Sequence, residues 1–260
     1  MRVLITGAAR AIGAATATEL MAAGHEVVAT ARDVALLADV PAALRLPLDV
    51  TDDASVAAAI DAAGPLDAIV NNAAVSGKGP LDSYPLDRLQ RMFETNTFGA
   101  LRVVQAVAPA WRERGSGVIV NVSSVQGRVA TPLEGPYAAS KYALEALSET
   151  LHYELGHFGI RVVIIEPGYI APGMKATDQH LGDSAYDELR TQWEGTDSKV
   201  VGERPGPELV GRAIVAAVTD PATPLRVPVG QDAELILGVR HQLDDASFEA
   251  TMRQTIGLTW

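Results

Sequence analysis

The chain has 260 residues, of which 48% are hydrophobic and 20% charged, as in globular rather than disordered proteins. Its 21 lysines and arginines against 32 aspartates and glutamates give a net charge of −11, which argues against nucleic acids and anionic membranes as partners. The absence of cysteine excludes disulfides, thiolate nucleophiles and thiolate zinc sites, and the five scattered histidines lack metal-binding spacing, so we expect no metal.

The chain also lacks the sequence features of a membrane or exported protein. No apolar run approaches the roughly 18–20 residues that a helix needs to cross a bilayer. The first residues have no signal-like region. We therefore expect a cytoplasmic protein that acts on small molecules.

Short apolar runs alternate with alanine-rich helical stretches along the chain. The predicted strands are 3–5, 26–30, 44–48, 66–70, 118–122, 161–165 and 225–229. The predicted helices are 14–23, 54–63 with Thr51 as its cap, a long helix from about 85 to 113, 137–155, about 208–218 and a helical tail.

This alternation predicts an α/β fold. Strands that are apolar throughout are typical of a parallel sheet buried on both faces, so we expect a Rossmann-type doubly wound sheet flanked by helices. We interpret residues 1–260 as a single domain. The polar segment of about 172–207 contains several glycines and prolines, which indicates a substrate loop or lid.

A loop of small residues, with Gly7, Ala11 and Gly13, joins the first strand to the first helix. Such a loop lets the backbone approach a pyrophosphate at a helix N-terminus. Gly7, Arg10, Ile12 and Gly13 are therefore candidate dinucleotide-binding residues. A compact turn that serves only packing is the alternative reading of the same pattern.

The end of the second strand bears on which dinucleotide fits. An acidic residue there binds the ribose 2′-hydroxyl of NAD, but this strand is followed by Arg32. Together with Arg10, Arg32 can clamp a 2′-phosphate, which favours NADP over NAD. Both arginines are alternatively ordinary surface residues, and Asp33 is close enough in sequence to neutralise Arg32.

Four polar side chains suggest catalysis. Tyr137 and Lys141 are one helical turn apart on one face. Ser124 follows the strand 118–122, and Asn96 lies within the predicted long helix. Taken singly, Tyr137 also fits a structural role as a half-buried aromatic ring, Ser124 as a turn hydroxyl and Asn96 as a polar group inside a helix.

In the order and spacing of these motifs along the chain, the sequence resembles the short-chain dehydrogenase/reductase family. The resemblance covers roughly residues 1–230. The residues of this chain are most similar to those of the branch that includes steroid dehydrogenases, retinol dehydrogenases and carbonyl reductases. The matching segments are 6–13, 48–50, 71–74, 96, 124–127, 137–141 and 167–168.

The resemblance implies a role for each catalytic candidate. Tyr137 is the general acid/base at the substrate oxygen, and Ser124 orients that oxygen. Lys141 lowers the tyrosine pKa, together with the charge of the oxidised nicotinamide, and binds the nicotinamide ribose. Asn96 holds a water that links Lys141 to solvent.

The resemblance also implies where the rest of the cofactor lies. Asp49 and Val50 meet the adenine, and the stretch from Asn71 to Ala73 lines the cofactor. The backbone near Ile170 holds the carboxamide, after Pro167 and Gly168. Tyr137 and Lys141 complete this set.

Three positions depart from the family pattern. Ala11 replaces a glycine, and its methyl group is expected to fit if the local φ is negative. Ala74 replaces the glycine that usually closes the Asn-Asn-Ala-Gly motif. Pro172 stands where a threonine often contacts the carboxamide, so that contact is left to backbone groups.

By position we also expect a substrate pocket on the loops that follow the strand ends. Its candidate residues are Val75, Gln126, Pro132, Leu133, Tyr169, Met174 and Trp193.

The sequence as a whole predicts an NADP-dependent oxidoreductase that interconverts an alcohol and a ketone or aldehyde on a mostly apolar small molecule. The alternatives are a non-catalytic dinucleotide-binding sensor and an epimerase or dehydratase that retains its nucleotide. Apolar outer faces on the two long central helices predict a homodimer or homotetramer.

Overall fold

A sheet of seven parallel strands organises the computed structural model, which describes residues 1–174, 178–179, 182, 184–194 and 204–260. The strand order is β3-β2-β1-β4-β6-β7-β9. The strands are β1 (Arg2–Ile5), β2 (Glu26–Ala31), β3 (Leu44–Pro47), β4 (Ala68–Asn71), β6 (Gly117–Val122), β7 (Ile160–Pro167) and β9 (Arg226–Val229). Because β1 pairs with both β2 and β4, the order reverses at β1, and ligands bind at such switch points.

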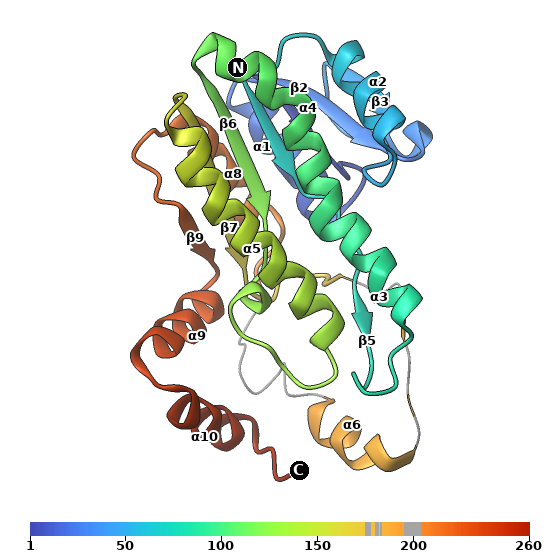
Figure 1. The fold of residues 1–260 in the computed structure, drawn as a ribbon, viewed down its shortest axis with the longest axis vertical. Helices are drawn as coiled ribbons and strands as arrows, with labels where there is room; N and C mark the ends of the chain where they lie inside the picture. The colour runs from blue at the N-terminus through green and yellow to red at the C-terminus, as the bar shows by residue number, and fades with distance from the viewer. Residues whose placement is uncertain (175–177, 180–181, 183, 195–203) are drawn as a thin grey trace.

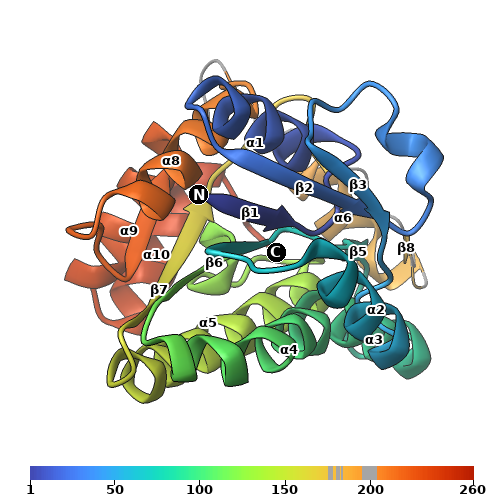
Figure 2. The same cartoon turned by 90° about the horizontal axis from the view of Figure 1, so that it is seen from above.

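Helices cover both faces of this sheet (Figure 2). One face carries α1 (Ala11–Ala22) and α8 (Glu208–Thr219), and the other carries α2 (Asp53–Ala63), α4 (Gly99–Arg114) and α5 (Gly135–Gly156). Shorter elements are η1 (Val34–Leu37), α3 (Leu86–Phe93), η2 (Glu94–Phe98) and η3 (Val125–Gly127). Figure 1 shows α9 (Gln231–Gln242) and α10 (Asp245–Ile256) beyond the end toward which the strand arrows point. The predicted doubly wound α/β sheet is confirmed.

Each face of the sheet has its own hydrophobic core. Val3 and Ile5 of β1 point to the side where Leu20 of α1 and Ile214 of α8 pack. Leu4, between them, points to the opposite side, where it meets the cluster of α2 and α4. Since successive strand residues face opposite sides, both faces of a central strand must be apolar, which explains the continuous apolar runs in the sequence.

Two details of the predicted helices are wrong. The cap of α2 is Asp52, whose side chain accepts from Ala54 N at 2.9 Å, rather than Thr51, which instead bonds to Asp49. The long helix predicted over 85–113 is interrupted, because Glu94–Phe98 form a turn of π-helix between α3 and α4. One extra residue in a turn shifts the apolar positions beyond it by a single place, and over helices this short such a shift does not separate a π-helical turn from a continuous helix.

The segment predicted as a substrate loop is described only in part. Within 172–207 the structure describes β8 (Asp178–Gln179), η4 (Ser184–Tyr186) and α6 (Asp187–Trp193), and the remainder lies mostly outside the described residues. The strand β8 pairs in parallel with β5 (Gly77–Lys78). This pairing ties the segment to the loop that follows β4.

Neither a membrane-spanning helix nor a metal-binding cluster occurs among the described residues. None of the helices there is long and apolar enough to span a bilayer. Nor does that part of the chain bring three or more His, Cys, Asp or Glu side chains together as a metal site.

Two buried carboxyl groups lie where α5, β7 and β9 meet. Glu145 of α5 and Glu166 of β7 are 4% and 2% exposed, and the charge of Glu145 acts on Glu166. Arg226 of β9 donates to Glu145 at 3.0 Å and lies 3.8 Å from Glu166, and Arg128 lies 4.0 Å from Glu166. Burial, together with repulsion by Glu145, raises the pKa of Glu166 to about 7 despite the two arginines.

This raised pKa predicts a pH-dependent stability. The folded state retains a proton on Glu166 up to about pH 7, whereas the unfolded chain releases it near 4.5. Folding stability therefore falls as pH rises through this range. We expect Glu166→Gln, which stays neutral, to gain roughly 1–3 kcal/mol over the parent between about pH 4.5 and 7, measured by urea unfolding.

The matched control is Glu149→Gln. Glu149 binds the same arginine at 2.8 Å, but its side chain is 47% exposed and Arg226 lowers its pKa, so no gain with rising pH is expected. Parallel pH profiles for Glu166→Gln and the parent would show that folding does not raise the pKa of Glu166, and would contradict the prediction.

Candidate active site

A cavity of about 210 Å³ lies at the carboxyl ends of the central strands. Its walls come from the glycine loop, from the ends of β4, β6 and β7 and from the first turns of α5. The described lining residues are Ile12, Asn72, Ala74, Ser76, Lys78, Val122, Ser123, Ser124, Val125, Gln126, Glu134, Tyr137, Lys141, Pro167, Gly168, Tyr169, Ile170, Gly173, Met174 and Arg204. The cavity therefore joins the predicted dinucleotide loop to the predicted catalytic residues.

The glycine loop is packed too tightly for side chains. Gly7 has φ +65°, and a Cβ there would lie 2.9 Å from the Ala73 Cα. A Cβ on Gly13 would overlap the Gly7 carbonyl oxygen and lie 2.7 Å from the Asn72 side chain. Helix α1 starts directly after Arg10 and has no acidic residue in its first turn, so its N-terminus offers N–H groups and a positive dipole to an anion.

The expected fit of Ala11 is wrong. Ala11 has φ +47°, in the left-handed region that costs a residue with a Cβ about 1–2 kcal/mol. It also begins α1, three residues earlier than predicted. The loop thus keeps the backbone conformation of a glycine at a position that carries a methyl group.

The end of β4 braces this loop. The Asn72 side chain donates to the carbonyl oxygens of Thr6 and Gly7, both at 3.0 Å, and the Thr6 hydroxyl accepts from the backbone N–H groups of Asn72 and Ala73. The Asn71 side chain instead lies inside the sheet, where it donates to Asn121 at 2.8 Å. Among the predicted strand-end residues, Asn72 and Ala74 line the cavity.

Tyr137 and Ser124 meet in the wall of the cavity. A hydrogen bond joins their side chains, and Ser124 Oγ also accepts from the Gln126 N–H at 3.1 Å, which fixes the serine as the cap of η3. Burial raises the pKa of Tyr137 well above its usual 10, and the charge of Glu134 raises it further, while the bond to Ser124 lowers it. In the chain alone the phenol is thus held protonated.

Lys141 lies one turn beyond Tyr137 and is 2% exposed. Its Nζ donates to the Val122 carbonyl oxygen at 2.8 Å and lies 5.7 Å from the centre of the Tyr137 ring. Burial lowers the pKa of Lys141 to about 8, although the charge of Glu145 raises it. An ammonium has three donors, and within the described residues one hydrogen bond is seen.

Asn96 lies in the π-helical turn and is 1% exposed. Its side chain accepts from the Val75 N–H and donates to the Val75 carbonyl oxygen, both at 2.8 Å, and it donates to Ser140 Oγ at 3.0 Å. Asn96 therefore ties the loop after β4 to α5, beside Tyr137 and Lys141. The π-helical turn is the feature that places this amide inside the fold.

Arg32 is exposed and follows the last residue of β2. Among the described residues Asp33 forms no ion pair with Arg32; its carboxylate instead accepts from the Ala35 N–H at 3.0 Å and caps η1. Burial tends to raise the pKa of Asp49, but hydrogen bonds from Thr51 and the charge of Arg32 bring that pKa below its ordinary value. Asp49 and Arg32 are thus neighbours, and Val50 is buried against Gly99.

The loop after β7 is held by an aspartate of α9. Asp232, 6% exposed, accepts from the Tyr169 N–H at 2.7 Å. A Cβ on Gly168 would overlap the same carboxylate, so that position requires glycine. Ile170 faces the cavity, whereas Pro172 is exposed and absent from its described lining.

The predicted substrate residues divide into two groups. Gln126, Tyr169 and Met174 line this cavity, and Trp193 lines a second, smaller one beside it. Val75, Pro132 and Leu133 line neither of the two cavities formed by the described residues.

Several residues of the site were not predicted from the sequence. Lys78 and Glu134 form an ion pair of 2.7 Å in the wall, and Glu134 is also bonded to Gln126. Arg204 lies over the Tyr169 ring at 5.3 Å. These residues come from loops far apart in the sequence, so no spacing pattern connects them. An acidic residue directly after the last strand was the one available signal for Asp232.

Comparisons with known proteins agree with this geometry. The family model described as short chain dehydrogenase matches residues 1–181. An uncharacterized oxidoreductase of Schizosaccharomyces pombe is 35% identical over 219 residues, which cover 81% of this chain and 92% of the relative.

Two solved structures have the same fold over nearly the whole chain. A short-chain dehydrogenase from Streptomyces avermitilis is 34% identical, with a TM-score of 0.80 and 98% of each chain covered. A short chain dehydrogenase from Burkholderia cenocepacia in complex with NADP is 26% identical, with a TM-score of 0.79 and 96% of each chain covered. The fold, the match of the family model and these relatives show that the chain is an oxidoreductase of the short-chain dehydrogenase family.

Proposed function

We propose that the protein is an NADP(H)-dependent oxidoreductase that interconverts an alcohol and a ketone or aldehyde on a mostly apolar small molecule. One observation carries the proposal. The hydroxyl of Tyr137, bonded to Ser124 and next to the buried Lys141, faces a cavity that extends to the glycine loop. A phenol, a hydroxyl and an ammonium in this arrangement suit proton transfer at a substrate oxygen.

In this proposal the substrate oxygen accepts hydrogen bonds from Ser124 and Tyr137. When bound, the nicotinamide supplies the hydride in reduction and accepts it in oxidation. Tyr137 donates its phenolic proton to the oxygen as a carbonyl becomes an alcohol, and it removes that proton in the reverse direction. The two remaining donors of Lys141 bind the ribose hydroxyls, and Asn96 holds the water that links Lys141 to solvent.

Several features of the chain fit a bound dinucleotide. The narrow glycine loop and the N-terminus of α1 receive the pyrophosphate, and Asn72 holds the loop in place. The loop of Pro167, Gly168 and Ile170 meets the carboxamide through its backbone, positioned by Asp232. Val50 and Asp49 lie beside Arg32, where the adenosine end is expected.

Arg32 and Arg10 carry the preference for NADP in this proposal. Both are exposed at the carboxyl edge of the sheet, and the strand β2 ends without an acidic residue. A guanidinium binds a phosphate through paired, charge-assisted hydrogen bonds. The solved relative in complex with NADP supports the same choice.

The described part of segment 172–207 supports a role as a substrate lid. Met174 and Arg204 border the cavity, and Trp193 of α6 borders the adjoining one. We propose that the segment covers the substrate within one domain of residues 1–260.

The protein is also proposed to form a homodimer or homotetramer through α4 and α5. Large side chains on or next to these helices remain exposed in the single chain, and single-chain exposure of this kind marks contact surfaces. They are Phe98, Tyr142, Tyr153 and Phe158.

A direct test is Tyr137→Phe, which keeps the ring and removes the proton. We expect kcat/KM for carbonyl reduction to fall about 10²- to 10⁴-fold, the usual contribution of a general acid. NADPH affinity, measured by fluorescence titration, should stay nearly unchanged. The substrate is first found by following NADPH and NADH absorbance across a panel of carbonyls and alcohols.

Tyr142→Phe is the matched control, since Tyr142 lies on the same helix with 42% of its side chain exposed. It should keep the parent activity. Near-parental turnover in Tyr137→Phe would refute the assigned mechanism. No absorbance change with any panel member would favour a dinucleotide sensor, and a nucleotide that copurifies unchanged through turnover would favour an epimerase or dehydratase.

The cofactor proposal has a separate test in Arg32→Ala. Losing a charge-assisted contact to the 2′-phosphate should reduce the NADPH/NADH ratio of kcat/KM by about tenfold or more. Arg212→Ala removes an exposed arginine of α8 and should leave the ratio as it is. An unchanged ratio in Arg32→Ala would exclude Arg32 as the discriminating residue.

A further inference from the structure

A second cavity adjoins the first on the side of the C-terminal helices. Val125, Gln126 and Tyr169 line both cavities, and Val125 directly follows Ser124. The described lining of the second cavity is Val125, Gln126, Val129, Thr131, Tyr169, Trp193, Ile236, Met252 and Ile256. The second cavity is therefore lined by the residue next to the group that is expected to hold the substrate oxygen.

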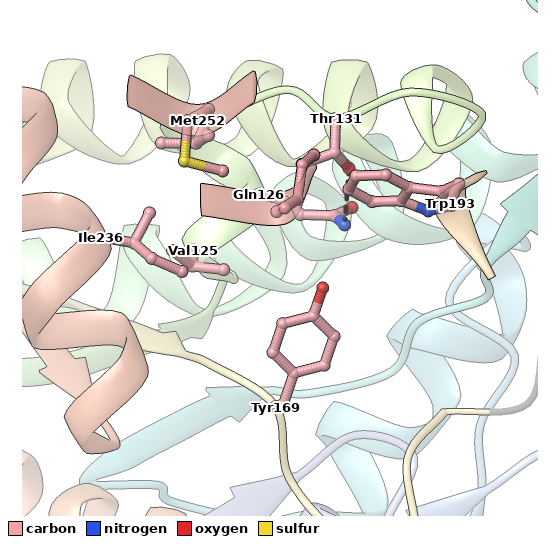
Figure 3. A pocket seen from close by; sticks show the side chains of 9 residues that line it. Val125, Gln126, Thr131, Tyr169, Trp193, Ile236 and Met252 are labelled. Atoms are coloured by element: carbon pink, nitrogen blue, oxygen red, sulfur yellow. Dashed lines mark hydrogen bonds between the residues drawn. The ribbon is translucent and has the colours of Figure 1, made fainter. Parts of the chain in front are cut away.

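The lining of this second cavity is mostly apolar, with polar groups on Gln126, Thr131 and Tyr169. In Figure 3, Met252 and Ile236 lie on one side, Trp193 and Thr131 lie on the other, and the hydroxyl of Tyr169 points toward the space between them. No charged residue is among its described lining residues. Val125 and Val129 also belong to a small hydrophobic cluster with Leu237, so the space interrupts packed apolar side chains.

The first cavity differs in character. Its described lining includes three charged side chains, namely Lys78 and Glu134, which are paired, and Arg204. Glu134 is bonded to Gln126, and Arg204 lies over the Tyr169 ring, so these charges border the polar lining residues that the two cavities share. The apolar side chains of the second cavity are therefore the part of this combined space that suits an apolar group of a ligand.

We propose that the second cavity is a binding arm for a short, unbranched apolar group attached to the reacting carbon of the substrate. The proposal rests on the function proposed above and names the substrate class for that site. The arm has about 30 Å³ of space, room for about two or three water-sized groups at roughly 10–15 Å³ each. An empty apolar space of this kind weakens the packing around it, so an apolar group that enters it gains contacts.

Three lining residues of the arm lie outside the part of the chain that matches the family model. Ile236, Met252 and Ile256 come from α9 and α10, well beyond residues 1–181 that match the family model. Segments outside the shared core are where relatives of one fold differ in substrate. We infer that α9 and α10 set the length of the apolar group.

The test is a series of unbranched methyl ketones of increasing length, reduced with NADPH. We expect kcat/KM to rise about fourfold per added CH₂ over two or three members and then to level off. Met252→Trp fills the arm, so kcat/KM should no longer rise with the length of the ketone. Met252→Ala lengthens the arm and should move the plateau to longer ketones.

Gln254→Trp is the matched control, because it adds the same bulk to an exposed position of α10, on the other side of the helix from Met252. It should keep the parental profile. Since each profile is a ratio of rates within one protein preparation, a partial loss of folded protein cancels. If both Met252 variants kept the parental dependence of kcat/KM on ketone length, the proposal of a binding arm would be overturned.

A second readout does not need turnover. With NADPH bound, 2-hexanone should raise the melting temperature of the parent more than 2-propanone does, and Met252→Trp should abolish that difference. Failure to reduce any carbonyl would count against the proposed function, while this Met252-dependent shift would still support the arm. Equal shifts with both ketones in the parent would overturn it.

Discussion

The burial of Lys141 is the constraint on which the rest of the site depends. An ammonium group taken out of water needs partners, and Val122 at the end of β6 supplies one at 2.8 Å. That contact fixes the first turns of α5 against the centre of the sheet, which brings Tyr137 to Ser124. Asn96 secures the same turns from the opposite side through Ser140. The arrangement of Tyr137 and Ser124 is thus a consequence of how Lys141 is accommodated.

The same burial makes the site electrostatically incomplete in the chain alone. It raises the pKa of Tyr137 and lowers that of Lys141 to about 8, so both groups are held toward their neutral forms. A bound oxidised nicotinamide brings a positive charge that favours phenolate at Tyr137. The net charge of −11 does not oppose a polyanionic cofactor, because the proposed binding mode depends on the N-terminus of α1 and on nearby arginines. Fields close to the ligand outweigh distant, screened charges.

The sequence was sufficient to predict the sheet and the approximate helices, because apolar strands and a four-residue Tyr–Lys spacing are local patterns. It was insufficient where geometry depends on distant residues. The turn of π-helix at Asn96 shifts the apolar pattern by a single position, and the positive φ of Ala11 follows from a loop braced by Asn72. Asp232, Glu134 and Arg204 reach the site from separate parts of the chain, and Met252 reaches the second cavity from α10. Their roles appear only when the chain is folded.

The most direct measurement of the central account is the ionisation of Tyr137 when cofactor binds. The protein is titrated with NADP⁺ at about pH 9, below the usual tyrosine pKa of about 10, and the ultraviolet absorbance of tyrosinate is followed. The account predicts that binding produces a tyrosinate signal, with release of the phenolic proton, that is present in the parent and absent in Tyr137→Phe. Saturating NADP⁺ that binds without any difference between the two proteins would contradict it.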